Sequence, residues 1–344
     1  MPWQSIRGHD RVVEELRANL RHGRLPHAFL FVGPEGIGKR TFALALARAL
    51  LCERNDPDAL DPCGRCESCV YCDAGTHPDV NIVSKPAEKH ELPIQVIRAL
   101  CDDLSLKPVR GARKFAIVDD ADDLNEEAAN AFLKTLEEPP AGSVLILIGQ
   151  STDTQLDTVI SRCRVVRFEP LTDDDVAAIL LEHKQAESRE QALRLARRGE
   201  GSVTRALGFV DPAFEVFRRD LFDLLAAPEG FDPVVLASRM HEFIKDAGKE
   251  SVAQRARARL IFGEAARFFR SVLWQTAGLE PPSHDAGDRA AIAALAARLE
   301  PETVFLLADR CLEGDRHIER RAHVPLVLDA WSHDVAKSLA ASSA

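Results

Sequence analysis

The hydrophobic positions in the first half of the chain alternate between short apolar runs and segments with helical spacing. The apolar runs are typical of buried strands and cover residues 27–32, 114–120 and 144–149. The helical segments, typical of amphipathic helices, cover residues 40–52, 94–104 and 125–138. Strands that alternate with helices predict an α/β domain in which helices cover a mainly parallel sheet.

After Pro170 the pattern contains helical spacing alone. The helical segments cover residues 173–199, 211–225, 234–277 and 288–339, and loops are expected at residues 228–233 and 278–287. The second half is therefore predicted to be all-helical, with one small bundle followed by a larger one.

Composition and charge narrow the class of protein. The chain has 344 residues and is 46% hydrophobic, which is enough for packed cores and excludes disorder throughout. No apolar run approaches the roughly 18 residues of a membrane span, and the first residues lack the apolar block of a signal peptide. Eight cysteines without such a signal point to a reducing compartment, so we expect a cytoplasmic protein. The net charge of −10 argues against a protein that coats nucleic acid, so DNA contacts must be local or made by partners.

Residues 33–41, Gly-Pro-Glu-Gly-Ile-Gly-Lys-Arg-Thr, lie between a predicted strand and a predicted helix. Glycines let backbone N–H groups turn toward phosphate oxygens, and a lysine adds positive charge, which predicts a phosphate-binding loop. Its predicted nucleotide-binding residues are Gly33, Gly36, Gly38, Lys39 and Thr41. Hydrolysis of ATP needs a hydroxyl directly after the lysine to hold Mg²⁺, but Arg40 stands there and Thr41 comes one residue late. The loop therefore either binds nucleotide without turnover or stays empty.

The strand predicted over residues 114–120 ends in Asp119 and Asp120. In a phosphate-loop ATPase the first acid holds the metal ion and the second activates the attacking water. Asp120 is one methylene shorter than the glutamate usual at that place, so its reach to the water is poor. The alternative is a solvated acidic turn that caps the next helix.

The cysteines are clustered: Cys52 precedes a run with two residues between successive members, Cys63, Cys66, Cys69 and Cys72. This spacing lets successive thiolates face one ion from tight turns, and four thiolates make a closed structural zinc site. The first three cysteines of the run are predicted ligands, with either Cys52 or Cys72 as the fourth. The metal would stabilise an insertion that is too short for a core of its own.

Several further stretches occur together with these motifs: Gly8-His9-Asp10, residues 26–34, residues 74–79, residues 125–140, which include Leu-Lys-Thr-Leu-Glu-Glu-Pro-Pro, and Ser161-Arg162-Cys163. On these residues the chain resembles the clamp-loader branch of the AAA+ proteins, and within it the non-motor subunits of bacterial DNA polymerase III. The resemblance is dense over residues 5–170, diffuse over residues 171–209 and faint beyond.

The resemblance implies three domains and a set of partners. The domains are an AAA+ phosphate-loop domain over residues 1–170 with a zinc-binding insertion at residues 52–72, a helical lid over residues 171–210 and a helical collar for oligomerisation over residues 211–344. The partners are those of a hetero-oligomeric clamp loader: gamma/tau motor subunits, a delta subunit, the sliding clamp and primed DNA. The family pattern also favours Cys52, Cys63, Cys66 and Cys69 as the zinc ligands.

In the family, the arginine of the Ser-Arg-Cys motif points into the ATP site of the neighbouring subunit. Carried over, Arg162 would be this arginine finger, and its alternative is an ion pair with acids on its own surface. Three departures weaken catalysis by the chain itself, namely Arg40, Gln150 at a polar sensor position and Thr204 at the place of a sensor arginine. The expected protein is thus a non-motor subunit with weak or absent ATPase activity. The alternatives are a self-sufficient motor ATPase and a zinc-dependent DNA binder, which the net charge disfavours.

Overall fold

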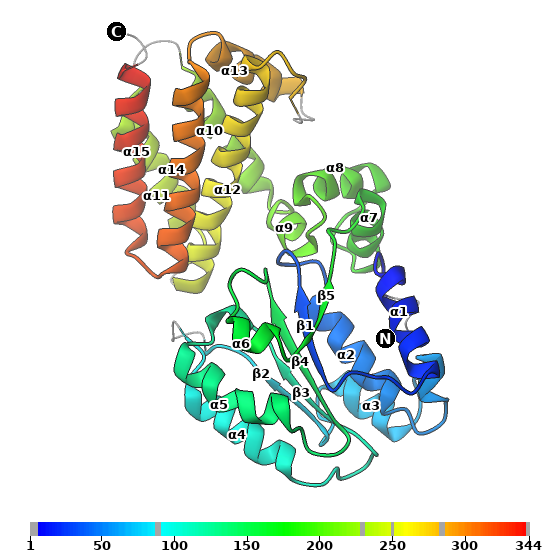
Figure 1. Cartoon of the computed structure of the whole chain (residues 1–344). Coiled ribbons are helices and arrows are strands. Elements are labelled where there is room, and N and C mark those ends of the chain that lie inside the picture. Colours follow the sequence, from blue (N-terminus) through cyan, green and yellow to red (C-terminus); the bar gives the residue numbers. More distant parts are fainter. Residues whose placement is uncertain (1–5, 87–90, 228–230, 249–250, 282–285, 342–344) are drawn as a thin grey trace. The chain divides into compact units, whose positions relative to one another are not determined.

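The computed structural model describes residues 6–86, 91–227, 231–248, 251–281 and 286–341 of the chain. The chain forms two compact units, Met1–Leu207 and Gly208–Ala344. In the described residues, the first unit contains a sheet with helices and the second contains helices alone (Figure 1). The helices in these ranges are all too short or too polar to cross a bilayer.

A five-stranded parallel sheet forms the centre of the first unit, as the alternating pattern predicts. Its strands are β1 (Ala28–Val32), β2 (Val80–Val83), β3 (Lys114–Val118), β4 (Ser143–Gly149) and β5 (Arg164–Arg167), in the order β2-β3-β4-β1-β5. The three central strands are buried along their whole length, which explains their continuous apolar runs. The prediction missed the edge strands β2 and β5, which are short and only partly buried.

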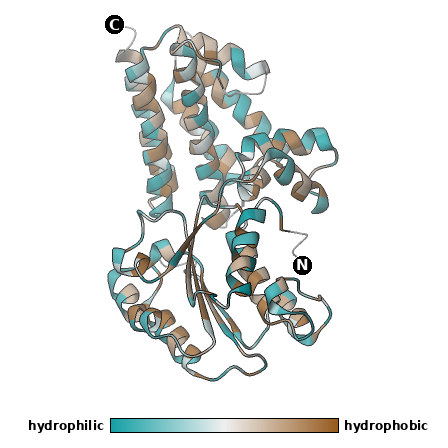
Figure 2. Ribbon diagram, turned by 45° about the vertical axis from the view of Figure 1, so that its right-hand side comes forward, coloured by the Kyte–Doolittle hydropathy of each residue, from teal (hydrophilic) through white to brown (hydrophobic). Residues whose placement is uncertain are grey.

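Helices cover both faces of this sheet. They are α1 (Asp10–Arg21), α2 (Lys39–Leu50), α3 (Glu67–Ala74), α4 (Ile94–Ser105), α5 (Glu126–Glu137) and α6 (Asp157–Ile160). Successive residues of β1 serve opposite faces, because Phe29 and Phe31 pack with α1 and α2 while Leu30 packs with α4 and α5. The strands accordingly form the apolar centre of the unit in Figure 2.

The predicted helical segment at residues 173–199 is divided in two. Three helices follow the sheet, namely α7 (Asp173–Glu182), α8 (Arg189–Gly199) and α9 (Val203–Gly208). The break contains Lys184 in the left-handed region, with φ 56°, and ends at Ser188, whose side chain accepts the Gln191 N–H. These helices begin within the same compact unit as the sheet.

The second unit consists, where described, of α10 (Pro212–Ala226), α11 (Pro233–Lys245), α12 (Ser251–Thr276), α13 (Ala286–Ala296), α14 (Pro301–Glu319) and α15 (Val324–Ala341). The all-helical prediction is confirmed, but its two longest segments are each broken into shorter helices. Gly248, with φ 92°, separates α11 from α12, and Pro301 opens α14. Close packing inside the unit requires Gly314, since a Cβ there would lie 2.5 Å from the Phe262 ring. The predicted loops at 228–233 and 278–287 include residues 228–230 and 282–285, which lie outside the described residues.

Candidate functional site: phosphate loop, cysteine cluster and surface arginine

The phosphate loop lies between β1 and α2, where the sequence predicts it. Gly36 and Gly38 adopt φ values of 76° and 93°, so the turn depends on the conformational freedom of glycine. Lys39 begins α2, and its Nζ donates hydrogen bonds to the carbonyl oxygens of Gly33 and Pro34 at 2.5 and 2.6 Å. Burial lowers the pKa of Lys39. A bound phosphate would have to replace these two carbonyls as partners of the ammonium group.

Arg40 and Asp119 form an ion pair at the place where a phosphate-loop ATPase holds its magnesium. Arg40 Nη1 lies 3.1 Å from Asp119 Oδ2, and the Asp119 side chain is 18% exposed. Burial and the neighbouring charge of Asp120 raise the pKa of Asp119, and the Arg40 charge opposes this rise. A guanidinium offers only donors, so it cannot bind Mg²⁺ and it engages the carboxylate that otherwise would. These residues do not fit a magnesium site.

The other expected catalytic groups are arranged no better for hydrolysis. Asp120 has a left-handed backbone with φ 61°, and its carboxylate accepts the backbone N–H of Lys85 at 3.2 Å. Thr41 is exposed one residue further along α2. The backbone N–H of Gln150 donates to Asp122 Oδ2 at 2.7 Å.

The start of α9 packs directly on the phosphate loop. The Val203 N–H donates to the carbonyl oxygen of Gly36 at 2.9 Å. A Cβ on Gly36 would lie 2.3 Å from Ser202 Oγ and 2.7 Å from Thr204 Cβ. Thr204 therefore lies against the loop at the position expected for a sensor arginine, whereas Arg205 pairs with Glu200 at 3.0 Å. The phosphate loop and the start of α9 are thus in direct contact.

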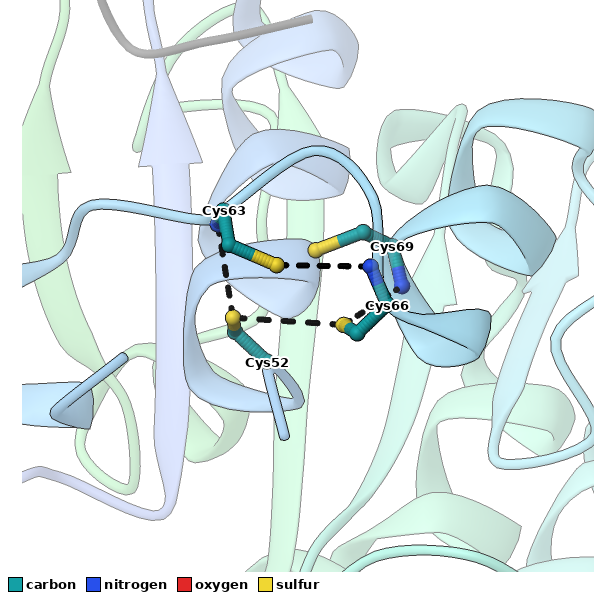
Figure 3. Close-up of side chains that lie close together, drawn as sticks. All are labelled: Cys52, Cys63, Cys66 and Cys69. Atoms are coloured by element: carbon teal, nitrogen blue, oxygen red, sulfur yellow. Dashed lines mark hydrogen bonds between the residues drawn. The ribbon is translucent and has the colours of Figure 1, made fainter. Parts of the chain in front are cut away.

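Four cysteine side chains converge just after α2 (Figure 3). Cys52 follows the helix, Cys63 lies on the next loop, and Cys66 and Cys69 lie at the start of α3. Their Sγ atoms all lie within 4.8 Å of one another, and those of Cys52 and Cys66 are 4.0 Å apart. A tetrahedral zinc ion with Zn–S bonds of about 2.3 Å needs sulfur atoms about 3.8 Å apart. The cluster could therefore hold a metal ion, and Cys72, which packs against the first unit's core, lies outside it.

Backbone N–H groups point at three of these sulfur atoms. The N–H groups of Cys63, Cys66 and Cys69 donate to the Sγ of Cys52, Cys63 and Cys66 at 3.4, 3.3 and 3.4 Å. Backbone hydrogen bonds, above all from Arg65, lower the pKa of Cys63 to about 6. Burial raises the pKa of Cys69 to about 12. The loop thus stabilises part of the negative charge of a thiolate cluster, and a cation would supply the rest.

Two buried groups, which the sequence did not identify, connect the cysteine cluster to the sheet. The Asp79 carboxylate is fully buried and accepts the N–H groups of Val109, Arg110 and Gly111 at 2.6, 2.8 and 3.2 Å. Arg48, buried on α2, pairs with Asp73 of α3 at 2.9 Å. The sequence signal for Asp79 is the stretch of residues 74–79, which the resemblance includes without giving this residue a role.

Arg110 connects the loop of residues 109–111 to the segments that carry the cysteine cluster. Its guanidinium bonds to Glu67 of α3, lies 3.4 Å from Glu53 and stacks over the Tyr71 ring at 5.2 Å. The predicted metal-binding insertion is therefore fixed to the sheet domain by charged contacts as well as by the cluster itself.

Arg162 lies on the surface immediately after α6, and its side chain is 31% exposed. Nε donates to Glu137 Oε1 at 2.7 Å and Nη2 donates to the same oxygen. Nη1 donates to the Thr158 carbonyl oxygen at 2.8 Å and to Ser161 Oγ at 3.2 Å. Within its own chain, the arginine therefore makes the local acid pair that the sequence left open as an alternative.

Residues 8–172 match the family described as "DNA polymerase III, delta subunit". The chain is 31% identical over 207 residues to DNA polymerase III subunit delta' of Bacillus subtilis, covering 57% of this chain and 61% of that protein. With subunit delta' of Escherichia coli it is 33% identical over 231 residues, covering 67% and 68%. The chain thus spans about three fifths to two thirds of the length of these relatives.

Weaker similarities extend to other subunits. The tau subunit of Escherichia coli is 31% identical over 210 residues, which cover 60% of this chain and 32% of that protein. Among solved structures, a gamma-subunit-related protein of Thermotoga maritima has 17% identity and a TM-score of 0.42, covering 94% of this chain and 99% of that one.

Proposed function

Because this chain belongs to the delta-prime family of DNA polymerase III, we propose that it is a non-motor subunit of a clamp loader in DNA replication. Its proposed partners are gamma/tau motor subunits and a delta subunit, and through the complex the sliding clamp and primed DNA. Its proposed role is to complete the ATP site of a neighbouring motor subunit.

The observation that carries the non-motor assignment is the ion pair between Arg40 and Asp119. A motor subunit must bind and release Mg²⁺-nucleotide in every cycle, and the metal needs both a hydroxyl and this carboxylate. The guanidinium replaces the hydroxyl and neutralises the carboxylate. The proposed phosphate loop is therefore a structural element that supports no rapid hydrolysis.

The proposed catalytic contribution is made in trans by Arg162. Its place on the surface just after α6, with a side chain that is 31% exposed, supports this role, since a finger must be accessible to the neighbouring subunit. An arginine finger stabilises the charge that develops on the transferred phosphoryl group and contributes roughly 10³–10⁵ to the rate at one site.

The proposed metal of the cysteine cluster is zinc, with Cys52, Cys63, Cys66 and Cys69 as its ligands. Four sulfur donors that lie within 4.8 Å of one another, enough to fill a tetrahedral site, support a structural role. The ion would connect the end of α2 to α3 and take no part in the chemistry.

The test is ATP turnover by a loader reconstituted from this chain and motor subunits whose own finger arginines are replaced. The measured turnover then reports the site that faces this chain. We expect Arg162→Ala to abolish most of it, and Arg164→Ala, which removes an exposed arginine of the same segment, to leave it nearly unchanged. Unchanged turnover with Arg162→Ala would refute the trans role.

The competing assignment is a self-sufficient motor ATPase, favoured by the turn of the phosphate loop and by Lys39 at the start of α2. The isolated chain separates the two assignments. We expect it to hydrolyse ATP negligibly, and turnover at the rate of an active motor subunit would support the competitor.

A further inference from the structure

We propose that Glu137 is a positioning residue, which holds the Arg162 guanidinium in the orientation needed to reach a phosphate on a neighbouring subunit. This inference rests on the proposed trans role of Arg162. It adds a residue on a different element, α5, to the machinery that the Ser-Arg-Cys motif defines.

The contacts of Arg162 fix its whole side chain. An arginine has five N–H donors, and four of them are engaged by three partners. Glu137 Oε1 takes the Nε and Nη2 donors, while Thr158 and Ser161 take both donors of Nη1. The second N–H of Nη2 takes no part in this network. Glu137 is the residue of the network that holds the edge formed by Nε and Nη2, which carries this N–H.

The base of Glu137 is rigid. It is the last residue of α5, whose buried residues Phe132 and Leu136 pack into the core beneath the sheet. A carboxylate at a helix C-terminus is disfavoured by the helix dipole, so Glu137 gains from a cationic partner beside it. The pair thus fixes the guanidinium to a helix of the sheet domain instead of leaving it on a flexible stem.

Removing Glu137 should slow catalysis because the Arg162 side chain would gain conformational freedom. Without Glu137, the guanidinium keeps only its Nη1 contacts and can turn away from the neighbouring site. Ordering a long side chain at an interface costs about 0.5–1.5 kcal/mol, which corresponds to a loss of about two- to thirteenfold when the ordering must occur in each catalytic event. The loss falls on kcat, because the nucleotide is bound by the neighbouring subunit.

The experiment uses the reconstituted loader described above. We expect Glu137→Ala to lower kcat about two- to thirteenfold with little change in KM. Glu137→Gln, which retains an acceptor oxygen, should keep most of the rate. Glu138→Ala removes the adjacent exposed carboxylate and serves as the matched control. The thermal midpoint and metal content of each variant report its folding.

A double mutant separates positioning from a general structural effect. In the Arg162→Ala background, Glu137→Ala should lower kcat no further, because the group that it positions is gone. An additive loss, an unchanged kcat or a faster Glu137→Ala loader would overturn the positioning role. If Arg162→Ala lowers turnover and Glu137→Ala does not, the inference fails while the trans role survives. If Arg162→Ala has no effect, the proposed function itself fails.

Discussion

Replacement of Asp79 by alanine tests how the cysteine-rich insertion is joined to the sheet. The carboxylate is fully buried and accepts three backbone N–H groups from residues 109–111. A hydrogen bond to a charged group contributes about 1.5–3 kcal/mol. Water can reach part of this loop in the variant, because Val109 is already 73% exposed in the unaltered protein. Removing the charge also removes its desolvation cost. We therefore expect Asp79→Ala to lower the free energy of unfolding by about 3–5 kcal/mol.

The assay is urea denaturation of the metal-loaded chain, followed by far-ultraviolet circular dichroism and by metal release, because Trp274 and Trp331 belong to the second unit and would not report on the sheet. Asp102→Ala, which removes an exposed carboxylate from α4, should change the free energy of unfolding by no more than about 0.5 kcal/mol. Metal release should become easier with Asp79→Ala, because the loop that carries Arg110 loses its anchor. A loss below about 1 kcal/mol would show that the three hydrogen bonds do not hold this loop and would refute the reasoning.

Three further predictions concern the metal, the lid and the phosphate loop. Metal analysis of reduced protein should find about one zinc per chain. Chelation of the metal or the substitution Cys69→Ser should lower the thermal midpoint. Reduced protein without zinc would contradict the proposed zinc site. Gly36→Ala should destabilise the chain more than Gly38→Ala in urea denaturation, because both have positive φ but a Cβ meets Ser202 and Thr204 only at Gly36. Equal losses of stability in the two variants would show that the contacts between α9 and the loop adjust without cost. Arg40→Thr should bind a fluorescent ATP analogue at least about tenfold tighter with Mg²⁺ than with EDTA. Mg²⁺ should not strengthen binding of the analogue to the unaltered chain. The same response to Mg²⁺ in both chains would refute the role of the ion pair.

The parts of the fold that the sequence predicts are those where burial is complete. The central strands β1, β3 and β4 contain uninterrupted apolar residues because both of their faces are covered. The edge strand β5 is Arg-Val-Val-Arg, whose charged ends resemble a loop in sequence. Helix ends in the second unit depend on single residues such as Gly248, which a periodic pattern does not register.

In the candidate site, too, local sequence patterns predict some residues, whereas contacts between distant residues decide the others. Spacing alone identifies a cysteine cluster, but the choice between Cys52 and Cys72 depends on how α2 and α3 pack. The sequence shows that Arg40 cannot bind magnesium, yet its pairing with Asp119, 79 residues away, requires the fold. Glu137 was equally hidden, because its partner Arg162 belongs to a different helix-to-strand connection.

The ion pair between Arg40 and Asp119 also changes what the acidic end of β3 indicates about this chain. A half-buried carboxylate without a cationic partner destabilises the fold, since nothing balances its charge. Here the guanidinium balances the charge of Asp119, which gives the acid a structural role that does not depend on a metal ion. A single substitution, Arg40→Thr, would both supply a hydroxyl and release the acid from its ion pair. Two acidic residues at the end of a strand, taken by themselves, therefore do not identify a site that binds Mg²⁺-nucleotide.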